Sequence, residues 1–157
     1  MAPARILVDG YSLLHNWPEL APGKPRHCEA ARNELIHWLT QYQDTTGTPV
    51  TVFFDGASPP TARPQPSSDL DLEVIYSSAG QTADTLIERT AYRLKPYGEV
   101  LVVTDDHAER DTVLSLGGMA SSCATFIQTL QATLGDSEEE LKRRNRRERR
   151  HFKRAME

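Results

Sequence analysis

Cysteine is scarce in this sequence: of 157 residues only Cys28 and Cys123 are cysteines, and neither lies in a CxxC or Cys/His spacing. This scarcity argues against a zinc site or a disulfide framework and indicates buried free thiols in a reducing cytoplasm. No apolar run approaches the roughly 20 residues that span a bilayer, and the N-terminal residues lack the apolar core of a secretory signal. Glycine-rich phosphate loops are also absent, so nucleotide-driven chemistry has no support.

Positive charge is scarce in most of the chain and concentrated at its end. Residues 1–141 carry 9 Lys or Arg against 20 Asp or Glu, a net charge of -11. Residues 142–157 carry the other 9 cations against two acids, a net charge of +7. We therefore expect an acidic domain over residues 1–136 and a basic helical extension over residues 137–157.

Strand and helix patterns alternate along the acidic part. Apolar and β-branched runs predict strands over residues 4–9, 50–55, 71–77 and 99–104. Amphipathic periodicity predicts helices over residues 27–46, 82–94, 107–116 and 122–134. Residues 56–68 hold four prolines and predict a surface loop. This alternation indicates an α/β fold around a largely parallel sheet that is covered on both faces.

Carboxylates lie at the ends of three of the four predicted strands, and two more lie near the start of a helix. These acids are Asp9, Asp55, Asp105 and Asp106 at the strand ends, with Asp84 and Glu88 on one face of the helix. Because functional crevices of parallel sheets lie beyond the carboxyl ends of the strands, we expect the acids to converge at one edge. Taken singly, each also fits a structural role as a turn residue or a helix cap.

Converging carboxylates need a counter-charge. Their repulsion is relieved by proton uptake or by a bound cation, and few Lys or Arg residues lie nearby in the sequence. Oxygen ligands without a Cys or His cluster favour Mg²⁺ or Mn²⁺ over zinc. Such a site can position and activate water for attack on a phosphodiester. The sequence therefore predicts a divalent-metal centre.

The basic extension has the pattern of a helix. Ser137 and Glu140 form a capping box, and acids precede bases along the segment, as the helix dipole favours. Its few apolar residues leave its cations either solvated or bound to the phosphates of a nucleic acid. We favour phosphate binding, because the acidic domain would otherwise repel such a substrate. The RNA-binding residues so predicted are Arg143, Arg144, Arg146, Arg147, Arg149, Arg150, Lys153 and Arg154.

Four blocks of the sequence together resemble the YacP-type NYN domain, a branch of the PIN-like nuclease superfamily. The blocks are LVDGYSLLHNWPEL, VFFDG, GQTADTLIE, and VVTDDHAERD with the later GGMASS, in the family's order and spacing. The resemblance covers most of residues 4–150. It implies a three-layer α/β/α sandwich and a metal-dependent endoribonuclease that acts on messenger RNA in association with ribosomes.

The resemblance also implies roles for individual residues. Asp9, Asp84 and Asp106 match the family's acidic positions, which makes them candidate catalytic residues and metal ligands. Two positions depart from the pattern: Ser12 stands where the family's DGYN motif has Asn, and Asp105 is an extra carboxylate before Asp106. The possible supporting residues are Ser12, Asp55, Glu88 and Asp105.

Two other functions stay open at this point. The change from Asn to Ser12 fits a domain of this fold that binds RNA or the ribosome without cleaving it. A haloacid-dehalogenase-like phosphatase also begins with a strand that ends in Asp, but it needs a second Asp where this chain has Tyr11. Near this motif, Gly10 fits a close backbone approach, Tyr11 fits packing or base stacking, and Trp17 fits a buried anchor.

Overall fold

The computed structural model describes residues 3–23, 28–56, 72–77 and 80–135. Its elements are β1 (Arg5–Asp9), α1 (Gly10–His15), η1 (Pro18–Leu20), α2 (Glu29–Thr46), β2 (Val50–Phe54), β3 (Glu73–Tyr76), α3 (Ala83–Leu94), η2 (Lys95–Tyr97), β4 (Val100–Val103), α4 (His107–Ser115) and β5 (Met119–Ser121). Residues 123–135 are also helical. The predicted proline-rich loop and basic extension lie outside the described residues, so the division of the chain at residue 136 stays a prediction.

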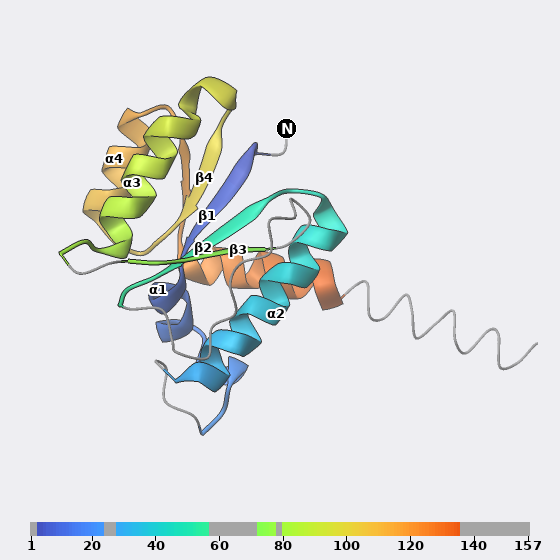
Figure 1. The fold of residues 1–157 in the computed structure, drawn as a ribbon. Coiled ribbons are helices and arrows are strands. Elements are labelled where there is room, and N and C mark those ends of the chain that lie inside the picture. The colour runs from blue at the N-terminus through green and yellow to red at the C-terminus, as the bar shows by residue number, and fades with distance from the viewer. Residues whose placement is uncertain (1–2, 24–27, 57–71, 78–79, 136–157) are drawn as a thin grey trace, which may run out of the picture.

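The five strands form one parallel sheet in the order β3-β2-β1-β4-β5. The first strand is central, with β2 and β4 as its neighbours (Figure 1). In this register Asp9 lies opposite Phe53 of β2, and Val8 lies opposite Val103 of β4. The residues that follow β1, β2 and β4 therefore meet at one edge of the sheet, as the sequence predicted.

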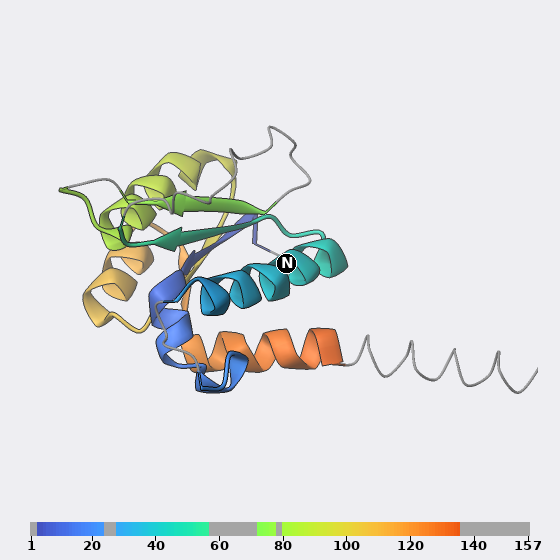
Figure 2. The same ribbon diagram turned by 60° about the horizontal axis from the view of Figure 1, so that its bottom comes forward.

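Helices cover both faces of the sheet and give three layers (Figures 1 and 2). Helices α3 and α4 lie on one face, and α2 and the helix over residues 123–135 lie on the other. Alternate residues of β1 enter the two cores, with Ile6 and Val8 on the α2 side and Leu7 on the α3 side. This double burial explains the continuous apolar strands and confirms the α/β/α sandwich.

Helix ends follow the capping signals of the sequence. Thr82 caps α3, its hydroxyl accepting from the backbone N–H of Thr85 at 3.2 Å. Gly47 ends α2 in the left-handed conformation, with φ of 75°, where glycine has no steric cost.

Helix α1 and strand β5 were not predicted from the sequence, and neither were the short 3-10 helices η1 and η2. Helix α1 has only six residues, too few for a helical period to show in the sequence. Strand β5 has only three, and it extends the sheet by pairing with β4 after two glycines. Both are fixed by tertiary contacts more than by local pattern.

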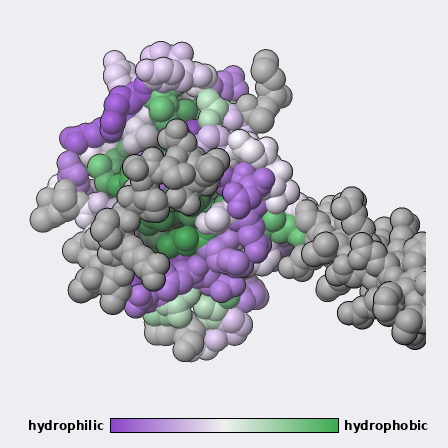
Figure 3. Space-filling model, turned by 45° about the vertical axis from the view of Figure 1, so that its right-hand side comes forward, coloured by the Kyte–Doolittle hydropathy of each residue, from purple (hydrophilic) through white to green (hydrophobic). Residues whose placement is uncertain are grey.

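Hydrophilic residues cover most of the described surface on the face that Figure 3 shows, and hydrophobic residues appear in smaller separate areas. Among the described residues, no helix combines the length and apolar character that crossing a membrane requires.

Candidate metal centre

Three carboxylates from three elements meet beyond the carboxyl edge of the sheet. Asp9 ends β1, Asp84 lies in the first turn of α3, and Glu109 lies in the first turn of α4. Each offers an oxygen within 4.8 Å of the others. Asp9 and Glu109 are 8% and 2% exposed, and Asp84 is half-buried. Because three carboxylates this close together repel one another and two of them are shielded from water, the group favours a bound cation or a shared proton.

Glu109 has one oxygen in use and one without a partner. The buried hydroxyl of Thr104 donates to Oε2 of Glu109 at 2.9 Å. The other oxygen, Oε1, is buried and has no hydrogen-bond partner among the described residues. Buried polar atoms are nearly always satisfied, and an exception next to two carboxylates fits an oxygen that ligates a cation. The donor set of three carboxylates suits Mg²⁺ or Mn²⁺.

Burial also changes the acidity of the group. It raises the pKa of Asp9 from 3.8 to about 6, an effect that the hydrogen bonds from Ser12 reduce and the nearby Asp84 and Asp55 carboxylates reinforce. The pKa of Glu109 lies far above its ordinary value, chiefly through burial and then through the adjacent Asp84 carboxylate, while the bond from Thr104 lowers it. Glu109 thus keeps a proton near neutral pH that a divalent cation would displace.

The segment over residues 9–12, DGYS, holds the Asp9 carboxylate in place. Asp9 is the N-cap of α1, and its Oδ1 accepts from the backbone N–H of Ser12 at 3.4 Å. The hydroxyl of Ser12 donates to Oδ2 of Asp9 at 2.9 Å. Gly10 allows this tight strand-to-helix junction, since a Cβ there would lie 2.3 Å from the Phe54 ring and 3.0 Å from the Phe53 carbonyl oxygen. Ser12 therefore orients the Asp9 carboxylate.

The neighbouring aromatics pack inside the protein. The Tyr11 ring meets Phe54 edge-on with centroids 5.1 Å apart, and Arg32 donates to the Tyr11 hydroxyl at 3.3 Å. Trp17 is buried against Trp38, also 5.1 Å between centroids. Of the roles that the sequence left open for Tyr11, packing is the one that these contacts support.

Asp55 and Asp105 lie near the group but bind the backbone of other elements. Oδ1 of Asp55 accepts from the N–H of Ala83 at 2.6 Å, which fixes the start of α3. Oδ1 of Asp105 accepts from the N–H of Cys123 at 2.9 Å, and its Oδ2 accepts from the Asn16 side chain at 2.6 Å. Each carboxylate thus joins two elements that surround the candidate metal centre.

Asp106 and Glu88 are outside the group of three. Asp106 is exposed and caps α4, its Oδ1 accepting from the N–H of Ala108 at 2.9 Å and of Glu109 at 3.3 Å. Glu88 is half-buried one turn after Asp84 on α3. A ligand role for Asp106 stays a prediction, while its cap holds the turn of α4 that carries Glu109.

Sequence reasoning missed Glu109. The spacing Asp106-x-x-Glu109 is typical of a capping box, in which a glutamate at this position turns back to its own helix terminus. Instead Thr104, at the end of β4, draws the Glu109 side chain toward the sheet edge. The available signal was Thr104 followed by an acid five residues later at the start of a helix.

Together these features define a class of protein: an α/β/α domain with buried carboxylates at the carboxyl edge of a parallel sheet. The family model of the YacP-like NYN domain matches residues 6–157, and the chain belongs to this family. The NYN domain is a nuclease-type fold, and the acidic group stands where such a domain could hold a metal.

Relatives from one organism support this assignment. The uncharacterized protein YacP of Bacillus subtilis (strain 168) is 31% identical over 127 residues, 80% of this chain and 74% of that protein. The crystal structure of Rae1 (YacP) from Bacillus subtilis is similar with a TM-score of 0.76 and 27% identity, covering 93% of this chain and 84% of that one. A mutant of Rae1 gives a TM-score of 0.71 and 29% identity, covering 91% and 81%.

Proposed function

We propose that this protein is a metal-dependent endoribonuclease that hydrolyses RNA phosphodiesters in the cytoplasm, with messenger RNA on the ribosome as its substrate. The observation that carries the proposal is Oε1 of Glu109, which is buried beside Asp9 and Asp84 and has no hydrogen-bond partner in the described part of the chain. Membership of a family with a nuclease-type fold supports the same reaction class.

The chain's residues have distinct roles in this proposal. Asp9, Asp84 and Glu109 would hold Mg²⁺ or Mn²⁺, Ser12 orients Asp9, and Thr104 orients Glu109. A bound divalent cation supplies an activated water and neutralises charge on the phosphate. The basic residues of the extension would bind the RNA backbone through a sequence-independent, salt-dependent attraction.

One observation favours a domain that binds RNA without cleaving it. The Ser12 hydroxyl donates its hydrogen bond to Asp9, so it offers a substrate fewer hydrogen-bonding groups than the longer carboxamide of Asn would. Because three carboxylates lie within reach of one cation, hydrolysis is the function that the geometry supports better.

Incubation of single-stranded RNA with Mn²⁺ tests the proposal. We expect cleavage by the wild type, none in EDTA, and a fall of at least about a hundredfold in rate for Asp9→Asn and Asp84→Asn, on the scale of an electrostatic group removed from an active site. Equal cleavage by the wild type and both variants would show that a different site or a contaminant is responsible.

A further inference from the structure

An exposed patch at the far end of α3 combines cations and aromatic rings. The described residues include six Lys or Arg, and three of them have polar partners: Arg5 bonds to Thr51, Arg32 to Tyr11, and Arg110 to Thr104. The side chains of the other three are exposed and make no hydrogen bond or ion pair with a described residue. They are Arg89, Arg93 and Lys95, all within seven positions of the chain.

Large hydrophobic side chains are exposed at the same place. Among the described residues the exposed ones are Tyr92, Tyr97 and Leu114, at 67%, 79% and 57%. The two tyrosines alternate with the three cations along α3 and η2, and Leu114 lies on α4, which packs against α3. An acidic domain therefore keeps a local cluster of positive charges, without a charged partner among the residues that the structure describes, together with two exposed rings. We call Arg89, Tyr92, Arg93, Lys95 and Tyr97 the α3 patch.

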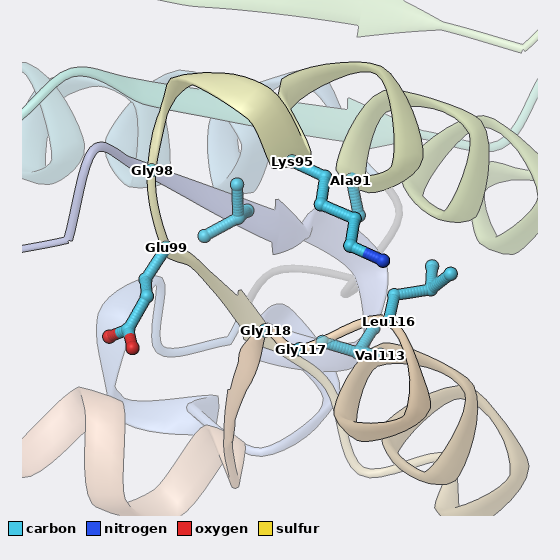
Figure 4. A pocket seen from close by; sticks show the side chains of 9 residues that line it. Ala91, Lys95, Gly98, Glu99, Val113, Leu116, Gly117 and Gly118 are labelled. Carbon is cyan, nitrogen blue, oxygen red and sulfur yellow. The ribbon is translucent and has the colours of Figure 1, made fainter.

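The α3 patch borders a hollow of about 320 Å³ between α3, α4 and the start of β4. Its walls include Ala91, Val100 and Val113, and Figure 4 shows Lys95 extending toward Leu116 while the Glu99 carboxylate points away from Lys95. Apolar walls with few polar side chains suit the flat face of a base better than base-specific hydrogen bonding.

Helix α3 connects this patch to the metal centre. Asp84 lies in the first turn of α3 and Tyr92 lies eight residues later, about 12 Å along the axis at 1.5 Å per residue. Phosphate-binding cations interleaved with stacking aromatics are how single-stranded nucleic acid is held without sequence preference. We propose that the α3 patch binds single-stranded RNA on the strand leading away from the metal centre; this inference rests on the proposed function.

The test is RNA binding by the full chain in EDTA, measured by fluorescence anisotropy with a labelled single strand over a range of salt concentrations. The variant Arg89→Gln/Arg93→Gln/Lys95→Gln is expected to bind more weakly, with a slope of log K against log salt reduced by about 2, at about 0.7 for each phosphate that is no longer neutralised. Its control, Asn33→Asp/Gln41→Glu/Thr45→Glu, changes net charge equally on the exposed surface of α2 and should keep the wild-type slope. An unchanged slope in the first variant, or an equal reduction in the control, would overturn the inference.

The aromatic part is tested separately. Tyr92→Ala/Tyr97→Ala should weaken binding by on the order of tenfold, and Tyr92→Phe/Tyr97→Phe should restore it, because phenylalanine keeps the stacking face. Equal binding by the Ala and Phe variants would contradict stacking.

Substrate length separates this inference from the proposed function. With Mn²⁺, the triple Gln variant should cleave a long single strand less efficiently than the wild type, but a dinucleotide, too short to reach the patch, equally well. No cleavage of either substrate by the wild type defeats the proposed function, whereas equal long-strand cleavage by variant and wild type defeats the inference alone.

Discussion

Two oxygen atoms affect the acidity and the ligand capacity of the candidate metal centre, Oγ of Ser12 and Oε1 of Glu109. The first donates to Asp9 and thereby keeps the pKa of that carboxyl lower than burial alone would make it. The second has no partner among the described residues. Changes at either atom should alter metal affinity without altering the fold.

Substituting Ser12→Ala should weaken metal binding in a pH-dependent way. Removing the hydrogen bond raises the Asp9 pKa further above about 6, so a proton competes more strongly with the cation. We expect Mn²⁺ affinity to fall by about threefold to tenfold at pH 6, as for the removal of one hydrogen bond, and by less at pH 8. Isothermal titration at both pH values measures this, with Ser115→Ala on the exposed part of α4 as the control. A fall that is the same at both pH values would contradict the proton-competition account.

Glu109 should make the metal-free protein less stable as the pH rises. An unfolded glutamate loses its proton near 4.5, whereas burial raises the pKa of folded Glu109 well above that value. At pH values between these two pKa values, folded Glu109 keeps a proton that the unfolded residue has lost, so the free energy of unfolding falls as the pH rises. Asp9 adds a smaller decrease in the free energy of unfolding between pH 3.8 and about pH 6, because burial raises its pKa over that range.

Thermal unfolding in EDTA between pH 5 and 8 measures this effect. The melting temperature of the wild type should fall across this range, and that of Glu109→Gln should fall less, because Gln cannot ionise. Saturating Mn²⁺ at pH 8 should stabilise the wild type and not the variant. A wild-type protein whose stability in EDTA rises with pH would be inconsistent with buried, proton-holding carboxylates.

At the scale of elements, the junction of β1 and α1 depends on the absence of a side chain at Gly10. Gly10→Ala would bring a Cβ to 2.3 Å from the Phe54 ring, so either the ring or α1 must move. We expect the free energy of unfolding in urea to fall by about 1–3 kcal/mol. The double variant Gly10→Ala/Phe54→Leu should cost less than the sum of the single changes, because the smaller side chain removes the clash. Additive costs would argue against this steric coupling.

Asp106 caps α4, and the sequence also predicts it to be a metal ligand; two substitutions distinguish these roles. Asn caps a helix as well as Asp does but lacks the charge of a metal ligand. We therefore expect Asp106→Asn to keep the wild-type stability and most of its Mn²⁺ affinity, while Asp106→Ala loses about 1 kcal/mol of stability. If Asp106→Asn loses metal as completely as Asp84→Asn does, Asp106 is a ligand, as the sequence predicted.

The elements also explain what the sequence could and could not predict. Asp9 follows the short apolar run Ile6–Val8 and Asp84 follows a helix cap, so strand order and helix polarity alone place both at one edge. Glu109 could not be found this way, because its direction depends on Thr104 at the end of a different element. Asp55 and Asp105 could be placed near the edge, but their backbone partners, Ala83 and Cys123, lie 28 and 18 positions away in the chain.

The charge asymmetry acts on the molecule as a whole. Neutralising the eight basic residues predicted to bind RNA, between Arg143 and Arg154, should weaken binding to single-stranded RNA and reduce its salt dependence by about 0.7 in slope for each phosphate that the variant no longer neutralises. Mn²⁺ affinity should stay unchanged, since the variant leaves Asp9, Asp84 and Glu109, the residues proposed to hold the metal, as they are. Anisotropy and calorimetry measure the two quantities, and an unchanged salt slope would leave the extension without a role in RNA binding.

The most direct test of the metal centre is an equilibrium Mn²⁺ titration followed by electron paramagnetic resonance of the free ion, on the wild type, Asp84→Asn and Glu109→Gln. We predict that the wild type binds Mn²⁺ and that both variants lose binding, because each removes one of three converging carboxylates. Wild-type binding by Glu109→Gln would contradict the assignment of its unpartnered oxygen to a metal.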